Sequence, residues 1–177
     1  DIKGHSKVAE LPFRTDNHNG SFMQWVDNDS IAFSPPGGVA GQLLIVNADT
    51  GAVEVGPYTG GFLGDNNYGG KILMSIRFNK SNVGERGIYE LDTKTTKIRQ
   101  IIRTEDLLPY YDKYEWKGGR DFTTWKIAHV KYSTDGSYIA FVVMPYGPGR
   151  KANLFTCKTD GSDLRFWGGD QPMHYSW

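Results

Sequence analysis

The sequence predicts an all-β protein built from short antiparallel strands. Apolar residues with helical spacing are almost absent along the chain. Short segments rich in β-branched and aromatic residues alternate instead with clusters of Asp, Asn, Gly and Pro. Of the 177 residues, 22 are glycines and 14% are aromatic. This composition suits many short strands joined by tight turns.

The first group of predicted strands covers the N-terminal third of the chain. Its four members are Phe22–Val26, Ser30–Phe33, Gln42–Val46 and Ala52–Val55. The last two strands are joined by Asn47-Ala48-Asp49-Thr50-Gly51. In this turn Asp49 can cap its own backbone and Gly51 can adopt a positive φ. We therefore expect the last two strands to form a hairpin.

Two later groups repeat the pattern. The second group comprises Lys71–Phe78, Gly87–Leu91 and Ile98–Ile102. The third comprises His129–Tyr132, Tyr138–Met144, Ala152–Thr156 and Leu164–Trp167, with tight turns at Ser133-Thr134-Asp135-Gly136-Ser137 and Thr159-Asp160-Gly161-Ser162. The segment His174–Trp177 then resembles the first strand of another unit.

The spacing of these groups predicts a β-propeller. His174 follows His129 by 45 residues, which fits the ~40–45-residue period of a four-stranded propeller blade. We expect one domain over residues 1–177, with blades at about 20–58, 70–103 and 129–168 and the start of another at 174–177. Because a ring closes with ~4–8 blades, the prediction is a partial ring of three to four blades belonging to a longer chain. A small self-closed sandwich of the same strands is the alternative.

Two stretches interrupt the repeat. Residues 56–70 are rich in Gly, Asn and aromatic residues, and they are predicted to form a long connection with room for one strand. Residues 104–128 form an insertion that carries aromatic side chains among charges, and long insertions in compact domains are usually functional or disordered. Glu105-Asp106-Leu107-Leu108 predicts a short helix with Thr104 as its cap.

Composition excludes several classes of function. The 20 basic and 20 acidic side chains cancel, so a general nucleic-acid surface is not expected. No apolar run approaches the ~20 residues of a membrane helix. The single Cys157 excludes an internal disulfide and a cysteine zinc site. The sequence lacks a Gly-x-Ser-x-Gly elbow, a phosphate loop and a dinucleotide fingerprint.

Three segments carry a resemblance to a known family. "HVKYSTDGSYIAFVV", "NLFTCKTDGSDLRFW" and "HYSW" resemble the blades of TolB-like, WD40-like β-propellers, and "FMQWVDNDSIAF" and "GIYELDTKTTKIRQII" look like weaker copies. The resemblance covers Phe22 to Trp177 apart from the two interruptions. Because propellers host many activities, it bears on fold more than on function.

A narrower likeness is to the oligogalacturonate lyase group of propeller polysaccharide lyases. That group holds manganese through several His and a Gln, and uses an Arg as base. The resemblance implies a site for Mn or another divalent cation on His129, His174 and Gln171. Ser176 stands where a further His ligand would be expected, and no Arg matches by motif. Ulvan lyases are also propellers and use His and Tyr, which leaves the substrate sugar open.

The repeat itself also brings two histidines together. First strands of blades line the central channel, so His129 and His174 occupy equivalent positions in adjacent blades. Two neutral imidazoles can share a divalent cation; alternatively, each bonds the backbone of a neighbouring blade. His18 lies near a blade mouth and is a candidate for substrate binding, or else a turn residue among Asn and Asp.

The chemistry that such a site suits is β-elimination from a uronate. A lyase must stabilise the enolate derived from the carboxylate and must supply a base for the C5 proton. The catalytic candidates are Arg150, Arg77 and Tyr146, and those for substrate binding are Arg120, Trp116 and Trp125. Solvated surface Arg and aromatic rings packed between blades are the alternatives.

Together these observations predict a bacterial, exported propeller lyase for acidic oligo- or polysaccharides. There is no signal peptide at Asp1, but a mature exported chain would look the same after processing, and we expect a periplasmic or extracellular protein. A non-catalytic propeller that binds a glycan or a protein is the alternative. In either case we expect no nucleic-acid partner and no membrane insertion, and remaining blades or a second chain would complete the ring.

Overall fold

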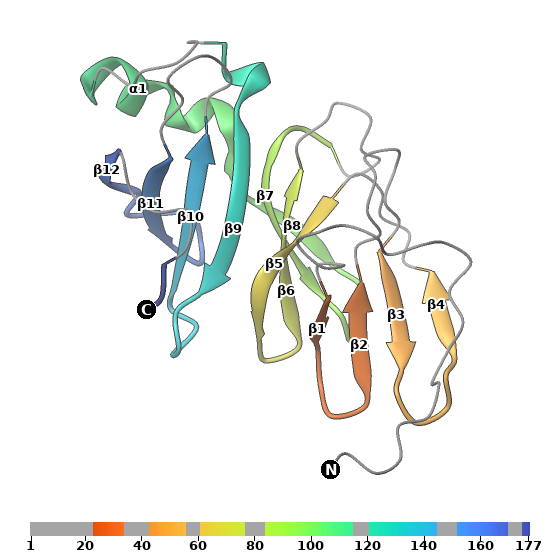
Figure 1. Ribbon diagram of the computed structural model, residues 1–177. Helices are drawn as coiled ribbons and strands as arrows, with labels where there is room; N and C mark the ends of the chain where they lie inside the picture. Colours follow the sequence, from red (N-terminus) through yellow and green to blue (C-terminus); the bar gives the residue numbers. More distant parts are fainter. Residues whose placement is uncertain are drawn as a thin grey trace, which may run out of the picture.

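The computed structural model describes residues 23–33, 43–55, 61–76, 84–114, 121–144, 152–169 and 175–177. These residues form three four-stranded antiparallel sheets in which each strand pairs with the next in the chain (Figure 1). The first sheet comprises β1 (Met23–Trp25), β2 (Ser30–Phe33), β3 (Leu44–Asn47) and β4 (Val53–Val55). The second comprises β5 (Gly61–Tyr68), β6 (Lys71–Ile76), β7 (Gly87–Asp92) and β8 (Ile98–Arg103). The third comprises β9 (Lys126–Tyr132), β10 (Tyr138–Met144), β11 (Asn153–Lys158) and β12 (Arg165–Gly169).

The sheets pack face to face in chain order, as blades do. The first strands of the three sheets lie side by side, since β5 contacts both β1 and β9. From these first strands the other strands of each sheet extend outward (Figure 1). The predicted propeller is thus confirmed as a partial ring, and the strands do not form a two-layered sandwich. In the following, β1, β5 and β9 are called the inner strands.

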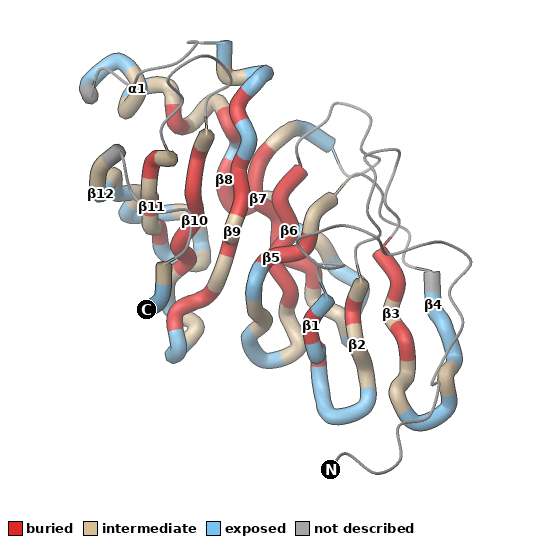
Figure 2. Tube along the Cα trace, viewed as in Figure 1, coloured by how far each residue is buried: buried red, intermediate tan, exposed pale blue. Residues whose placement is uncertain are grey.

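Two hydrophobic cores fill the spaces between successive sheets. One joins the first and second sheets, and the other joins the second and third. Strand β6 contributes to both, because Ile72 and Met74 face the first sheet while Leu73 faces the third. A strand buried on both faces has a run of consecutive apolar residues, as in Ile72-Leu73-Met74 of β6 (Figure 2).

The hairpin that ends each sheet has the same type of cap. The Asn47 side chain accepts hydrogen bonds from the backbone of Asp49 (3.1 Å) and Thr50 (2.8 Å). Asp92 makes equivalent bonds in the second sheet, and Asp160 bonds the backbone of Ser162 in the third. The residue that caps the first hairpin is therefore Asn47 rather than the predicted Asp49, because its side chain reaches the amides two and three residues ahead. Gly51 has the predicted positive φ, at 70°.

Three other local predictions are confirmed in part, with bounds that differ in the structure. The stretch over residues 56–70 does contain one strand, but this is the inner strand β5, so the second sheet begins at Gly61 rather than near residue 70. The 104–128 insertion forms two short 3-10 helices, η1 (Thr104–Leu107) and η2 (Phe122–Thr124), and the helix α1 (Leu108–Tyr114). Arg103, not Thr104, precedes η1, and its backbone N–H donates to the Asp106 carboxylate at 2.9 Å.

The predicted strand at 174–177 is not present in the described part of that segment. Tyr175, Ser176 and Trp177 have no strand pairing, and His174 lies outside the described residues.

Candidate functional site

Four residues from two inner strands and the C-terminal segment form a polar group, which we call the inner-strand cluster. They are Asp65 on β5, His129 and Lys131 on β9, and Tyr175. The Asp65 Oδ2 atom lies 3.5 Å from His129 Nδ1 and 3.3 Å from Lys131 Nζ. The three side chains are 31%, 24% and 17% exposed, respectively. The cluster is therefore accessible while its charges are partly shielded from water.

A β-bulge directs His129 toward Asp65. Lys131 pairs with Ala140 and Ala128 pairs with Val142, so two residues of β9, His129 and Val130, stand opposite one residue of β10. His129 takes the left-handed conformation, with φ of 51°, which few residues other than glycine adopt. Bulges redirect side chains and are frequent next to active sites.

The C-terminal segment closes one side of the cluster. The Lys131 ammonium donates to the Tyr175 carbonyl oxygen at 2.7 Å and lies 4.3 Å from the centre of its ring. The Tyr175 hydroxyl donates to the His129 carbonyl oxygen. Burial, and then the nearby Asp65 carboxylate, raise the pKa of Tyr175 well above its usual value. The phenol therefore stays protonated at neutral pH, so it donates a hydrogen bond and cannot act as a base.

The residues beside Asp65 hold β5 against β9. The Asn66 side chain bonds the backbone of Tyr132 twice, accepting from its N–H at 2.7 Å and donating to its carbonyl at 3.1 Å. Gly64 permits this approach, because a Cβ there would lie 2.5 Å from the Val130 carbonyl oxygen. The distance between Asp65 and His129 is thus set by backbone packing on both sides.

Two of the predicted site residues can be placed. His129 belongs to the inner-strand cluster. Trp125 is 2% exposed, stacks on Tyr111 with ring centres 5.6 Å apart, and belongs to the core between the second and third sheets. Its ring is packed inside and does not offer a face to a sugar. The other predicted site residues lie outside the described ones: Arg77, Arg120, Arg150, Tyr146, His18, Trp116, Gln171 and His174.

Sequence reasoning did not select the partners of His129. Asp65 lies in a segment without a strand-like pattern, and Lys131 sits two residues after His129 in the strand motif. Lys131 could have been found from the alternation of side chains along a strand, because residues 129 and 131 lie on the same face. No sequence signal links β9 to Asp65.

The described residues fit a divalent cation poorly. Among them no group of three or more metal-ligating side chains occurs. His129 Nδ1 and Asp65 Oδ2 have a spacing that two ligands of one ion can have, but Lys131 occupies the same carboxylate oxygen. The Lys131 ammonium would repel a cation bound to this carboxylate. Two positive unit charges about 4 Å apart repel by about 4 kcal/mol near a protein surface, and the repulsion is twice as large when one of them is a divalent ion.

Comparisons with known proteins define the fold. No protein-family model and no curated protein match the chain. Among solved structures, TolB from Acinetobacter baumannii matches with 16% identity and a TM-score of 0.51, over 81% of this chain and 30% of that one. A structure titled oligogalacturonate lyase in complex with manganese matches with 14% identity and a TM-score of 0.42, over 72% of this chain and 30% of that one.

These observations identify the class of protein. The chain is part of a β-propeller. More particularly, its sheets share the fold of part of TolB, and the chain spans about 30% of the length of either solved structure. Within the described residues, α1 is seven residues long, and no helix is long and apolar enough to cross a membrane.

Proposed function

We propose that this propeller is a polysaccharide lyase that cleaves uronate-containing oligo- or polysaccharides by β-elimination at the inner-strand cluster. The observation that carries the proposal is the meeting of Asp65, His129 and Lys131 on the inner strands. A base, a group that orients it and a cation are what elimination beside a carboxylate requires.

His129 serves as the base in this proposal. With Nδ1 directed to Asp65, the imidazole is held in the tautomer whose Nε2 can accept a proton. Nε2 removes the C5 proton of the uronate, and the electron pair forms the C4–C5 double bond. The C4–O bond then breaks, and the leaving oxygen takes a proton from water or a protein donor. Asp65 stabilises the imidazolium that forms.

Lys131 neutralises the substrate carboxylate. Its ammonium is partly shielded, which strengthens its attraction for an anion relative to bulk water. A carboxylate of the substrate would share the ammonium with Asp65. This arrangement stabilises the enolate without a metal ion, and a Mn or other divalent site on His129, His174 and Gln171 is the competing arrangement.

The test is elimination by the full chain on polygalacturonate and ulvan fragments, followed by the ultraviolet absorbance of the unsaturated product. His129→Ala is expected to lower kcat by roughly 10²–10⁴-fold, the usual contribution of a general base. Lys97→Ala, an exposed lysine in the β7–β8 hairpin, is the control and should leave the rate unchanged. Equal rates for wild type and His129→Ala would overturn the proposal.

A chelator separates the two arrangements. Activity that survives EDTA supports His129 as base with Lys131 as the cation. Activity that is lost in EDTA and returns with Mn²⁺ would replace this mechanism with the metal arrangement.

A second candidate is a non-catalytic propeller that binds a glycan or a protein. It is favoured by the interactions of Lys131, which bonds Asp65 from one inner strand and the Tyr175 carbonyl from the C-terminal segment. A cluster of this kind also joins adjacent parts of the ring. Binding of an acidic oligosaccharide without any unsaturated product would favour this candidate.

We further propose that additional blades complete the ring and that the protein works in the bacterial periplasm or outside the cell. The outward face of the first sheet supports the first point, because Met23 and Trp25 on it are 64% and 54% exposed. An additional blade would cover these side chains. The covering blade would come from the remainder of a longer chain or from a second chain. The mass of the native protein and of its complexes tests this.

A further inference from the structure

A separate pocket opens beside the insertion between β8 and β9. Its volume is about 420 Å³, within the ~300–1,000 Å³ range of small-molecule sites. It is lined by Gly84, Glu85, Arg86, Thr104, Glu105, Phe122 and Thr123. Its walls therefore come from the segment before β7, from η1 and from η2. None of the inner-strand cluster residues lines it.

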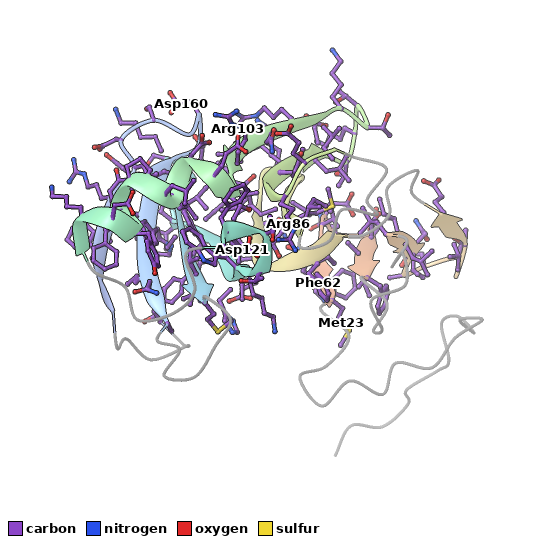
Figure 3. The ribbon with its side chains drawn as sticks, turned by 90° about the horizontal axis from the view of Figure 1, so that it is seen from above. Met23, Phe62, Arg86, Arg103, Asp121 and Asp160 are labelled. Carbon is purple, nitrogen blue, oxygen red and sulfur yellow. The ribbon has the colours of Figure 1, made fainter. Side chains whose placement is uncertain are left out.

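Arg86 is the cation of the pocket. Its guanidinium donates to the Phe122 carbonyl oxygen, with Nη1 and O 3.4 Å apart. Burial lowers the pKa of Arg86 more than the nearby Asp121 carboxylate raises it, although an arginine remains charged at any physiological pH. Figure 3 shows Arg86 and Asp121 beside each other. The donor is thus held against η2 and its charge is partly balanced.

Two carboxylates complete the polar lining. Glu105 is held by Arg103, whose Nη1 lies 2.6 Å from Oε1, and Glu85 is exposed at the pocket edge. The Thr104 and Thr123 side chains add hydroxyl groups, and the half-buried Phe122 adds an apolar surface. The lining therefore mixes acceptors, donors and one aromatic ring.

This mixture selects against a charged ligand. The carboxylates of Glu85 and Glu105, with Asp121 close by, would repel a carboxylate or phosphate. The guanidinium of Arg86 would repel an ammonium group. A hydroxyl group both donates to a carboxylate and accepts from a guanidinium, and the apolar face of a sugar ring packs on an aromatic side chain.

We propose that this pocket binds an uncharged sugar residue, at a site distinct from the inner-strand cluster. Glu85 and Glu105 accept hydrogen bonds from its hydroxyls, Arg86 donates to a ring or hydroxyl oxygen, and Phe122 contacts its apolar face. The proposal goes beyond the lyase function and does not depend on it, because a non-catalytic glycan-binding propeller would use the pocket in the same way.

The experiment is a titration of the full chain with methyl galactoside and methyl rhamnoside, followed by backbone amide NMR shifts. Shifts are expected at residues 84–86, 104–105 and 122–123. Glu85→Gln keeps the shape of an exposed side chain and should weaken binding about tenfold, since hydrogen bonds to charged groups are the stronger kind. Glu54→Gln, on the distant β4, is the matched control and should bind as wild type.

Arg86→Lys provides a second variant, with its thermal unfolding measured alongside. It is expected to weaken binding while the chain stays folded at the titration temperature, because a lysine keeps the charge but cannot reproduce the planar fork of donors. Galacturonate and ethylammonium serve as charged probes. Binding of either one at the pocket in preference to the neutral glycosides would overturn the proposal, and so would an absence of shifts at these residues. His129→Ala should leave the titration unchanged, so failure of the lyase proposal would be seen separately.

Discussion

Replacing Tyr132 by Phe should weaken the contact between the second and third sheets. The Tyr132 hydroxyl on β9 donates to the Glu90 carboxylate on β7 at 2.8 Å, and Arg99 donates to the other oxygen of that carboxylate at 2.8 Å. Glu90 is 5% exposed. A hydrogen bond to a buried charged group contributes ~1.5–3 kcal/mol. We expect the variant to lose about 2 kcal/mol of unfolding free energy, which corresponds to roughly 4–8 °C in melting temperature.

The loss should depend on pH in a defined direction. Burial alone would raise the pKa of Glu90, but the hydrogen bonds from Arg99 and Tyr132 outweigh it and hold this pKa below the usual 4.5. A lowered carboxyl pKa stabilises the fold above the unfolded-state value, and the stabilisation disappears as the pH falls through the folded-state value. The difference between wild type and Tyr132→Phe should therefore be largest at neutral pH and should shrink in acid.

Urea unfolding at neutral and acid pH measures both effects. Tyr138→Phe, on β10 of the same sheet, is the control and should change stability by less than about 0.5 kcal/mol. An unchanged midpoint for Tyr132→Phe at neutral pH would refute the argument that this hydrogen bond links the sheets. A loss of equal size at both pH values would show that the ionised Glu90 is not its cause.

Three further predictions concern other parts of the fold. Gly64→Ala should destabilise the chain by ~1–3 kcal/mol in urea, because its new Cβ meets the Val130 carbonyl and overpacks the β5–β9 contact; wild-type stability would contradict that close approach. Asp135 accepts hydrogen bonds from Ser133 and Ser137, which lower its pKa to about 2, so its stabilising effect is present above about pH 4 and lost toward pH 2. Asp135→Asn should flatten the acid dependence of thermal unfolding in that window, and an unaltered profile would count against it. Burial raises the pKa of Cys157 to about 12, so a thiol reagent at neutral pH should label it after unfolding, while rapid labelling of the folded chain would be the contrary result.

Most strands could be predicted because their sequence pattern and their environment agree. In β2 and β10 the predicted bounds match the structure, since apolar β-formers lie between unambiguous turn residues. The bounds of β5 could not be predicted, because Gly-Phe-Leu-Gly-Asp-Asn-Asn-Tyr contains two glycines, an Asp and two Asn, all of which are depleted in strands. This segment becomes a strand through its packing between β6 and β9, and Gly64 is required there by the approach of the Val130 carbonyl. Tertiary contacts of this kind leave no local signal.

The same reasoning explains which part of the site was predictable. His129 could be selected because the blade repeat places it at the start of an inner strand. Asp65 could not, because the register between first strands of neighbouring sheets is set by side-chain packing and not by a ladder of backbone hydrogen bonds. The predicted equivalence of His129 and His174 also assumes that a histidine finds its partner in the corresponding position of another blade. In the structure, the side chain beside His129 on the neighbouring inner strand is the carboxylate of Asp65, and His174 lies outside the described residues.

The charge of Lys131 distinguishes the two arrangements proposed for the inner-strand cluster, metal-free elimination and a divalent-cation site. The bulge at His129 brings the imidazole to a carboxylate whose same oxygen already faces an ammonium group. The ammonium offsets part of the charge of that carboxylate, so Asp65 orients the imidazole and stabilises an imidazolium less than an unpaired carboxylate would. If Lys131 were neutral, Asp65 and His129 would together offer a cation one acidic and one imidazole ligand. Lys131→Met should therefore increase the affinity of the chain for Mn²⁺, measured by calorimetry, whereas unchanged Mn²⁺ affinity would mean that the lysine does not control the electrostatics of the site.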